Sequence, residues 1–121
     1  METNQFTVEK YYDISQLETI SRGNVDFIKK MLTLFIEQAP ALLAELKNNY
    51  DSRELVSMGE VAHKIKPIVD NMGILSIKAA IREVEKIGKS NTISHLLPDL
   101  IIQVDFALNR AILEIRKDYE L

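Results

Sequence analysis

Apolar residues recur every three or four positions through most of the chain, which is the period of an amphipathic α-helix. This spacing predicts a short helix over residues 14–21 and four long helices with apolar stripes over residues 27–46, 55–72, 77–87 and 96–115. The period-two alternation of half-buried strands is missing. Short connections make consecutive helices antiparallel, so we predict an all-α, up-down-up-down four-helix bundle with the short N-terminal helix covering it.

Polar residues and glycines mark the places where the predicted helices begin and end. Side chains that accept hydrogen bonds from free backbone N–H groups favour helix starts, and glycine favours helix stops. The predicted ends are two capping boxes (Asp13 with Gln16, and Asp51 with Glu54), one N-terminal cap (Asn24) and three C-terminal stops (Gly23, Gly73 and Gly88).

The composition fits one soluble domain over residues 1–121, with residues 1–10 as a flexible or extended N-terminal segment. The chain has no cysteine, which excludes disulfides, thiolate metal sites and a cysteine nucleophile. No apolar run approaches the roughly 20 residues of a membrane span, so we expect a cytoplasmic protein without membrane insertion. A net charge of −3, with lysines scattered among glutamates, argues against nucleic-acid binding.

His63 lies in the stretch "VAHKIKPIVDNMG", residues 61–73, and is predicted to point away from the core. The apolar positions of its helix place it roughly 160° from the buried stripe, so the imidazole should face water. Val56, Gly59, Pro67 and Asp70 fall on the same outward strip. A mid-helix Gly59 costs on the order of 1 kcal/mol against alanine, which suggests that space beside the histidine matters. We interpret these four residues as a candidate docking surface for a transient partner.

Lys66 follows His63 by three residues and lies about 60° around the helix from it. Its ammonium group could reach a negative group attached to the ring, such as a phosphoryl group. Two other interpretations stay open: an exposed helical histidine without a function, and a metal ligand. A metal site needs further ligands, and the only other histidine, His95, is remote in sequence. The largely aliphatic stripes also argue against a helical metalloenzyme, so we expect neither a metal ion nor a cofactor.

The segment "AHKIK", residues 62–66, followed by "NMG" with its glycine ten residues after the histidine, resembles the signature of histidine-containing phosphotransfer domains. The lead-in "YDISQLETISRGNVDFIKKMLTLFIEQAPALLAELK" is also similar to that family, so the resemblance covers nearly the whole chain. It implies that His63 is the phosphoacceptor, through the ring nitrogen farther from the backbone. It further implies that Lys66 steadies the phosphate and that Gly73 forms a structural turn. Pro67 departs from the family, which usually has glycine there.

The resemblance implies a phosphorelay role in two-component signalling, in which phosphoryl groups pass between receiver-domain aspartates by way of His63. The expected partners are receiver domains of response regulators or hybrid histidine kinases, and a metal ion would belong to the receiver. The chain has no nucleotide-binding motif and should not phosphorylate itself from ATP, so it would be a monomeric carrier rather than a complete enzyme. The alternative is a helical bundle that binds a partner without phosphotransfer.

Overall fold

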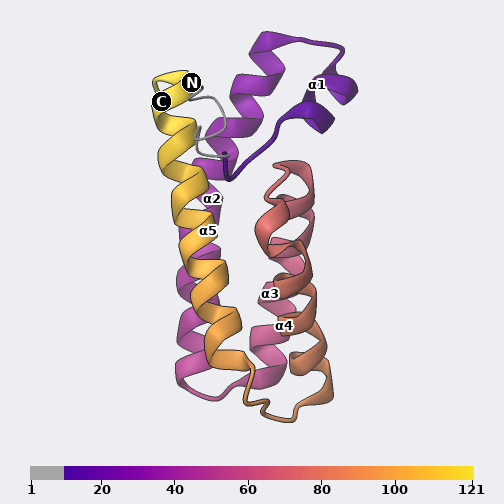
Figure 1. Cartoon of the computed structure of the whole chain (residues 1–121), viewed down its shortest axis with the longest axis vertical. Coiled ribbons are helices and arrows are strands. Elements are labelled where there is room, and N and C mark those ends of the chain that lie inside the picture. Colours follow the sequence, from indigo (N-terminus) through magenta and orange to yellow (C-terminus); the bar gives the residue numbers. More distant parts are fainter. Residues whose placement is uncertain (1–9) are drawn as a thin grey trace, which may run out of the picture.

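The computed structural model describes residues 10–121 and is all-helical over that range (Figure 1). It contains five α-helices and a short 3-10 helix: α1 (Ser15–Ser21), α2 (Val25–Asp51), α3 (Leu55–Asn71), η2 (Leu75–Ile77), α4 (Lys78–Ser90) and α5 (Leu97–Tyr119). The prediction of an all-α chain is therefore confirmed. Nearly all of the segment expected to be flexible or extended, residues 1–9 of 1–10, lies outside the described residues.

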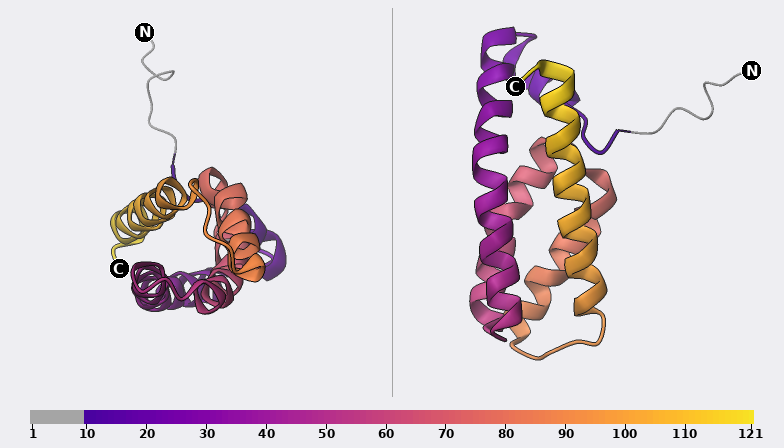
Figure 2. Two further views of the ribbon diagram at one scale, coloured as in Figure 1. Left: turned by 90° about the horizontal axis from the view of Figure 1, so that it is seen from below. Right: turned by 90° about the vertical axis from the view of Figure 1, so that its left-hand side faces the viewer.

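The four long helices lie side by side, with α2 and α5 on one side of the molecule and α3 and α4 on the other (Figures 1 and 2). The most extensive helix contact joins α3 to α4, while α5 packs against both α2 and α4. Their inward residues form one aliphatic core, whose largest fully buried members include Leu32, Leu46, Met58, Ile65, Ile81 and Leu108. The short helix α1 packs on α2 and contributes Leu17 to this core. No helix of residues 10–121 is both long and apolar enough to cross a membrane.

The predicted helix starts are right in one case and wrong in two. The Asn24 side chain accepts a hydrogen bond from the Phe27 backbone N–H at 3.0 Å and caps α2, as predicted. The first capping box does not form, because Gln16 donates instead to Asn71 Oδ1 at 3.4 Å, although Asp13 accepts from Ser15. The second is also absent: α2 runs through Asp51, and Glu54 makes no side-chain cap on α3.

Gly73 has a left-handed backbone, with φ of +60°, directly after the end of α3, as its predicted role as a stop requires. Gly88, in contrast, is not a stop. Helix α4 continues to Ser90 and ends with Asn91 in the left-handed region.

Gly88 is buried because it lies against Gly59 of α3. A Cβ atom on Gly88 would lie 2.7 Å from the Gly59 nitrogen and from the Leu55 carbonyl oxygen, closer than real side chains come. The prediction that Gly59 lies on the outward strip is therefore wrong, since Gly59 is buried where the two helices approach. Glycine is needed here for the close approach of two backbones.

Candidate functional site

The candidate site lies across the outer side of the α3–α4 pair. Helix α3 presents His63, whose side chain is 66% exposed, and α4 presents Glu85, whose side chain is only 6% exposed. The glycine contact lies one turn from each of them, at Gly59 and Gly88, and brings the helices close enough for the two side chains to meet.

The Glu85 carboxylate gathers three nitrogen groups around it. His63 Nδ1 lies 2.6 Å from Oε2, and Lys66 Nζ donates to Oε1 at 2.8 Å. Lys89 Nζ lies 3.4 Å from Oε2, one turn further along α4. Glu85 is the only charged residue of the described chain that is buried, and these partners compensate its loss of water.

The hydrogen bond from Lys66 lowers the pKa of Glu85 to about 2, with further lowering by His63 and Lys89, against the opposing effect of burial. The carboxylate is therefore ionised at neutral pH and can only accept hydrogen bonds. In a neutral ring His63 must then carry its proton on Nδ1 and donate it to Glu85. The Nε2 atom keeps its lone pair on the exposed side of the imidazole.

An open depression of about 660 Å³ lies next to the imidazole. Val56 and Gly59 line it from α3, and Gly88 and Lys89 line it from α4, with His63 and Glu85 between them. The floor contains the two apposed glycines, so no side chain fills the space between the helices there. The surroundings of the ring are thus accessible, partly apolar and flanked by lysine.

The residues predicted for the site fall into two groups. Val56, 50% exposed, lies beside His63, and Gly59 borders the depression from its buried position. Pro67 is exposed and Asp70 is half-buried, but neither lines the depression. The Asp70 carboxylate accepts from Arg82 at 2.7 Å, so its nearest partner belongs to the protein itself. The docking role of all four residues stays a prediction.

Sequence reasoning missed Glu85 and Lys89. A signal for Glu85 exists in the helical period, because it follows Ile81 by four residues and precedes Gly88 by three. A carboxylate in the same row as these residues must lie against the neighbouring helix or at the edge of the contact between the two helices. Lys89 follows Glu85 by four residues, a spacing that favours an ion pair on one helix.

The structure does not bring the two histidines together. His95 lies in the connection between α4 and α5, whereas His63 is on α3. Within residues 10–121, no three His, Asp or Glu side chains are grouped so that they could hold a metal ion.

Comparison of the chain with protein-family models, with curated proteins and with solved structures finds no match.

Proposed function

We propose that this chain is a histidine-containing phosphotransfer domain, a phosphorelay intermediate that accepts a phosphoryl group on His63 from one receiver-domain aspartate and passes it to another. One observation carries the proposal: an exposed imidazole is held through Nδ1 by a buried, ionised glutamate, so that Nε2 faces solvent as a nucleophile. The partners would be receiver domains of response regulators or hybrid histidine kinases.

The proposed fold is the antiparallel up-down-up-down four-helix bundle with α1 as its cover. The connections between the long helices support it, since residues 52–54, 72–77 and 91–96 are too few to let consecutive helices run parallel. A rigid bundle fixes the backbone of α3, so that a docking receiver meets the His63 ring in one orientation.

In the proposed reaction, the Nε2 lone pair attacks the phosphorus of a receiver aspartyl phosphate, in line with the departing carboxylate oxygen. An N–P bond forms as the O–P bond breaks, and the receiver aspartate leaves as a carboxylate. The imidazole, still protonated on Nδ1, becomes positively charged, and the Glu85 carboxylate 2.6 Å away stabilises that charge. Transfer to the next receiver follows the same path in reverse.

Lys66 and Lys89 supply positive charge next to the phosphoryl position. Each ammonium group has three donors, so Lys66 can keep its bond to Glu85 and still donate to a phosphoryl oxygen. In the phosphorylated protein the two lysines would offset the negative charge of the phosphoryl group. In the unphosphorylated protein the carboxylate of Glu85 offsets the positive charge of the lysines.

The test is incubation with a phosphorylated receiver carrying labelled phosphate, followed by identification of the labelled residue. We expect wild type and His95→Gln to take up label and His63→Gln to take up none, with all three equally folded by circular dichroism. Label on the His63 variant would refute the assignment of the phosphoacceptor. Receiver binding without label on wild type would instead favour an interaction module without phosphotransfer.

A further inference from the structure

Helix α5 carries a row of exposed apolar side chains on its outer face. Ile102, Phe106 and Leu113 are 64%, 55% and 59% exposed, and exposed Asn109 lies between the last two. Their spacing of four, three and four residues is that of the alternating a and d positions of a coiled coil. This is the longest such row among the exposed large apolar residues of the described chain.

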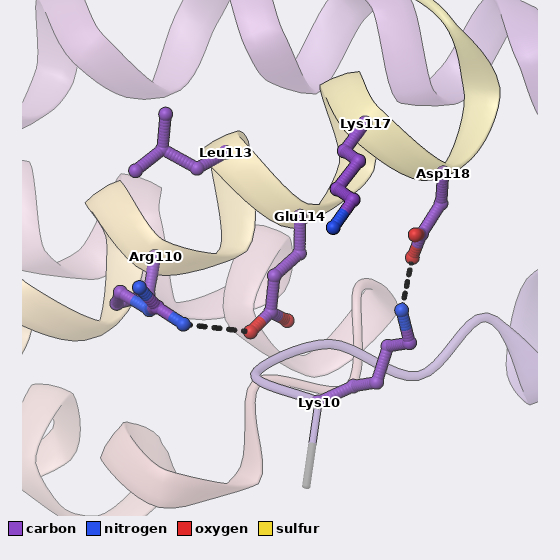
Figure 3. Close-up of a pocket in the computed structure, with 6 residues that line it drawn as sticks. All are labelled: Lys10, Arg110, Leu113, Glu114, Lys117 and Asp118. Atoms are coloured by element: carbon purple, nitrogen blue, oxygen red, sulfur yellow. Dashed lines mark hydrogen bonds and ion pairs between the residues drawn. The ribbon is translucent and has the colours of Figure 1, made fainter. Parts of the chain in front are cut away.

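Residues 10 and 11, before α1, contact the neighbouring row of α5 and meet this row only at Phe106. Lys10 pairs with Asp118, the Tyr11 backbone N–H donates to Glu114 at 2.6 Å, and the Tyr11 ring meets Phe106 edge-on with centroids 5.7 Å apart. Figure 3 shows Lys10 paired with Asp118 and Arg110 paired with Glu114, while Leu113 points away from both pairs. Tyr11 therefore extends the apolar row at one edge without covering Ile102 or Leu113.

The charges at the two ends of the row have opposite signs. Exposed Asp99 lies at the start of α5, one turn before Ile102, and exposed Arg116 lies one turn after Leu113. Both continue the same three-and-four spacing. The row is thus acidic at its N-terminal end, apolar in the middle and basic at its C-terminal end. In an antiparallel second copy of the row, the acidic end would face the basic end and the apolar residues would face one another.

We propose that two copies of this chain associate through α5, with the two helices antiparallel about a two-fold axis. In the register that pairs a positions with d positions, Ile102 of one copy lies opposite Leu113 of the other, and Asp99 opposite Arg116. A parallel arrangement would instead place Asp99 beside Asp99 and Arg116 beside Arg116. The proposed dimer differs from the monomeric carrier expected from the sequence.

The dimer would not cover the candidate site. Helices α3 and α4, which carry His63 and Glu85, lie on the other side of the molecule from the α2–α5 pair (Figures 1 and 2). Both copies could therefore bind a receiver at once. The proposal goes beyond the phosphotransfer function and can fail or succeed independently of it.

The first test is sedimentation equilibrium of the full chain from about 10 μM to about 1 mM. We expect a monomer–dimer equilibrium that Phe106→Glu weakens at least tenfold. Leu75→Glu, at another exposed apolar residue, is the matched control and should leave the equilibrium unchanged. A monomer at every concentration would overturn the proposal, and so would a dimer that Phe106→Glu does not affect.

Charge reversal tests the antiparallel register. Asp99→Arg alone and Arg116→Asp alone each create like-charge pairs and should weaken the dimer, whereas an equimolar mixture of the two variants restores opposite charges at both ends.

The absence of native cysteine allows a direct check by disulfide cross-linking. Asp99→Cys mixed with Arg116→Cys should form a mixed disulfide-linked dimer under mild oxidation, faster than either variant forms one alone. Preferential linking of like positions, 99 to 99 or 116 to 116, would refute the antiparallel arrangement.

Discussion

Replacing Glu85 by glutamine should slow phosphotransfer at His63 although the side chain keeps its shape. An amide has one acceptor and one donor end, whereas Glu85 accepts from both His63 Nδ1 and Lys66 Nζ. If the amide oxygen faces His63, the NH₂ group meets the Lys66 ammonium, donor against donor. If it faces Lys66, the NH₂ group donates to Nδ1 and selects the tautomer whose proton is on Nε2, which removes the nucleophilic lone pair.

The size of the effect follows from the contact that is lost. A hydrogen bond to a charged group contributes roughly 1.5–3 kcal/mol. In the proposed transfer, the ring that contacts Glu85 gains positive charge, so most of the contribution should appear in the barrier. We therefore expect transfer at saturating receiver to slow by about tenfold to a hundredfold in Glu85→Gln.

The same variant should change how stability depends on pH. In the folded protein the pKa of Glu85 is about 2, below its ordinary value of 4.5. The carboxylate thus contributes stability that is fully present above pH 4.5 and is lost as pH falls toward 2, by at most about 3 kcal/mol. Glu85→Gln should lack this part of the acid destabilisation.

The assays are rapid-quench measurement of transfer from a phosphorylated receiver and urea unfolding at a series of pH values. The matched control is Glu83→Gln on the same helix, since Glu83 is half-buried and outside the site. It should leave both the transfer rate and the acid dependence near wild type. Wild-type transfer together with wild-type acid dependence in Glu85→Gln would refute the role assigned to this carboxylate.

Three further substitutions test other parts of the site. Lys66→Ala should slow transfer about tenfold or more, because it removes a cation beside the site and the hydrogen bond that this cation donates to buried Glu85. An unchanged rate in rapid-quench experiments would make Lys66 a surface charge only. Gly88→Ala should lower the free energy of unfolding, measured with urea, by about 1–3 kcal/mol, because the added Cβ meets the backbone of α3. Wild-type stability of this variant would contradict the close approach of Gly88 to Gly59. Val56→Glu should raise the dissociation constant of the receiver, measured by calorimetry, about tenfold, which corresponds to a loss of binding free energy on the order of 1.4 kcal/mol. The melting temperature should stay unchanged because Val56 is half exposed. Equal affinities of variant and wild type would place the receiver interface elsewhere.

The sequence determined the helices and the outward direction of His63. Both follow from the 3.6-residue period, which is set by neighbours along the chain: the apolar residues 55, 58, 62 and 65 of α3 are buried, and the His63 side chain is mostly exposed. The cap at Asn24 is equally local, since its acceptor lies three residues from the donor. The first failed capping box shows where a local pattern loses to a tertiary contact, because Gln16 donates to Asn71 of α3 instead.

Only the tertiary structure decided which polar residue meets His63. Glu85 is 22 residues away in sequence, and its burial depends on the distance between α3 and α4. The close approach requires Gly59 and Gly88, for which the sequence predicted other roles, because glycine also ends helices and a single sequence does not show which backbones meet. Helical period fixes the direction of a side chain about its own axis, but the separation and rotation of two packed helices follow from all the side chains between them.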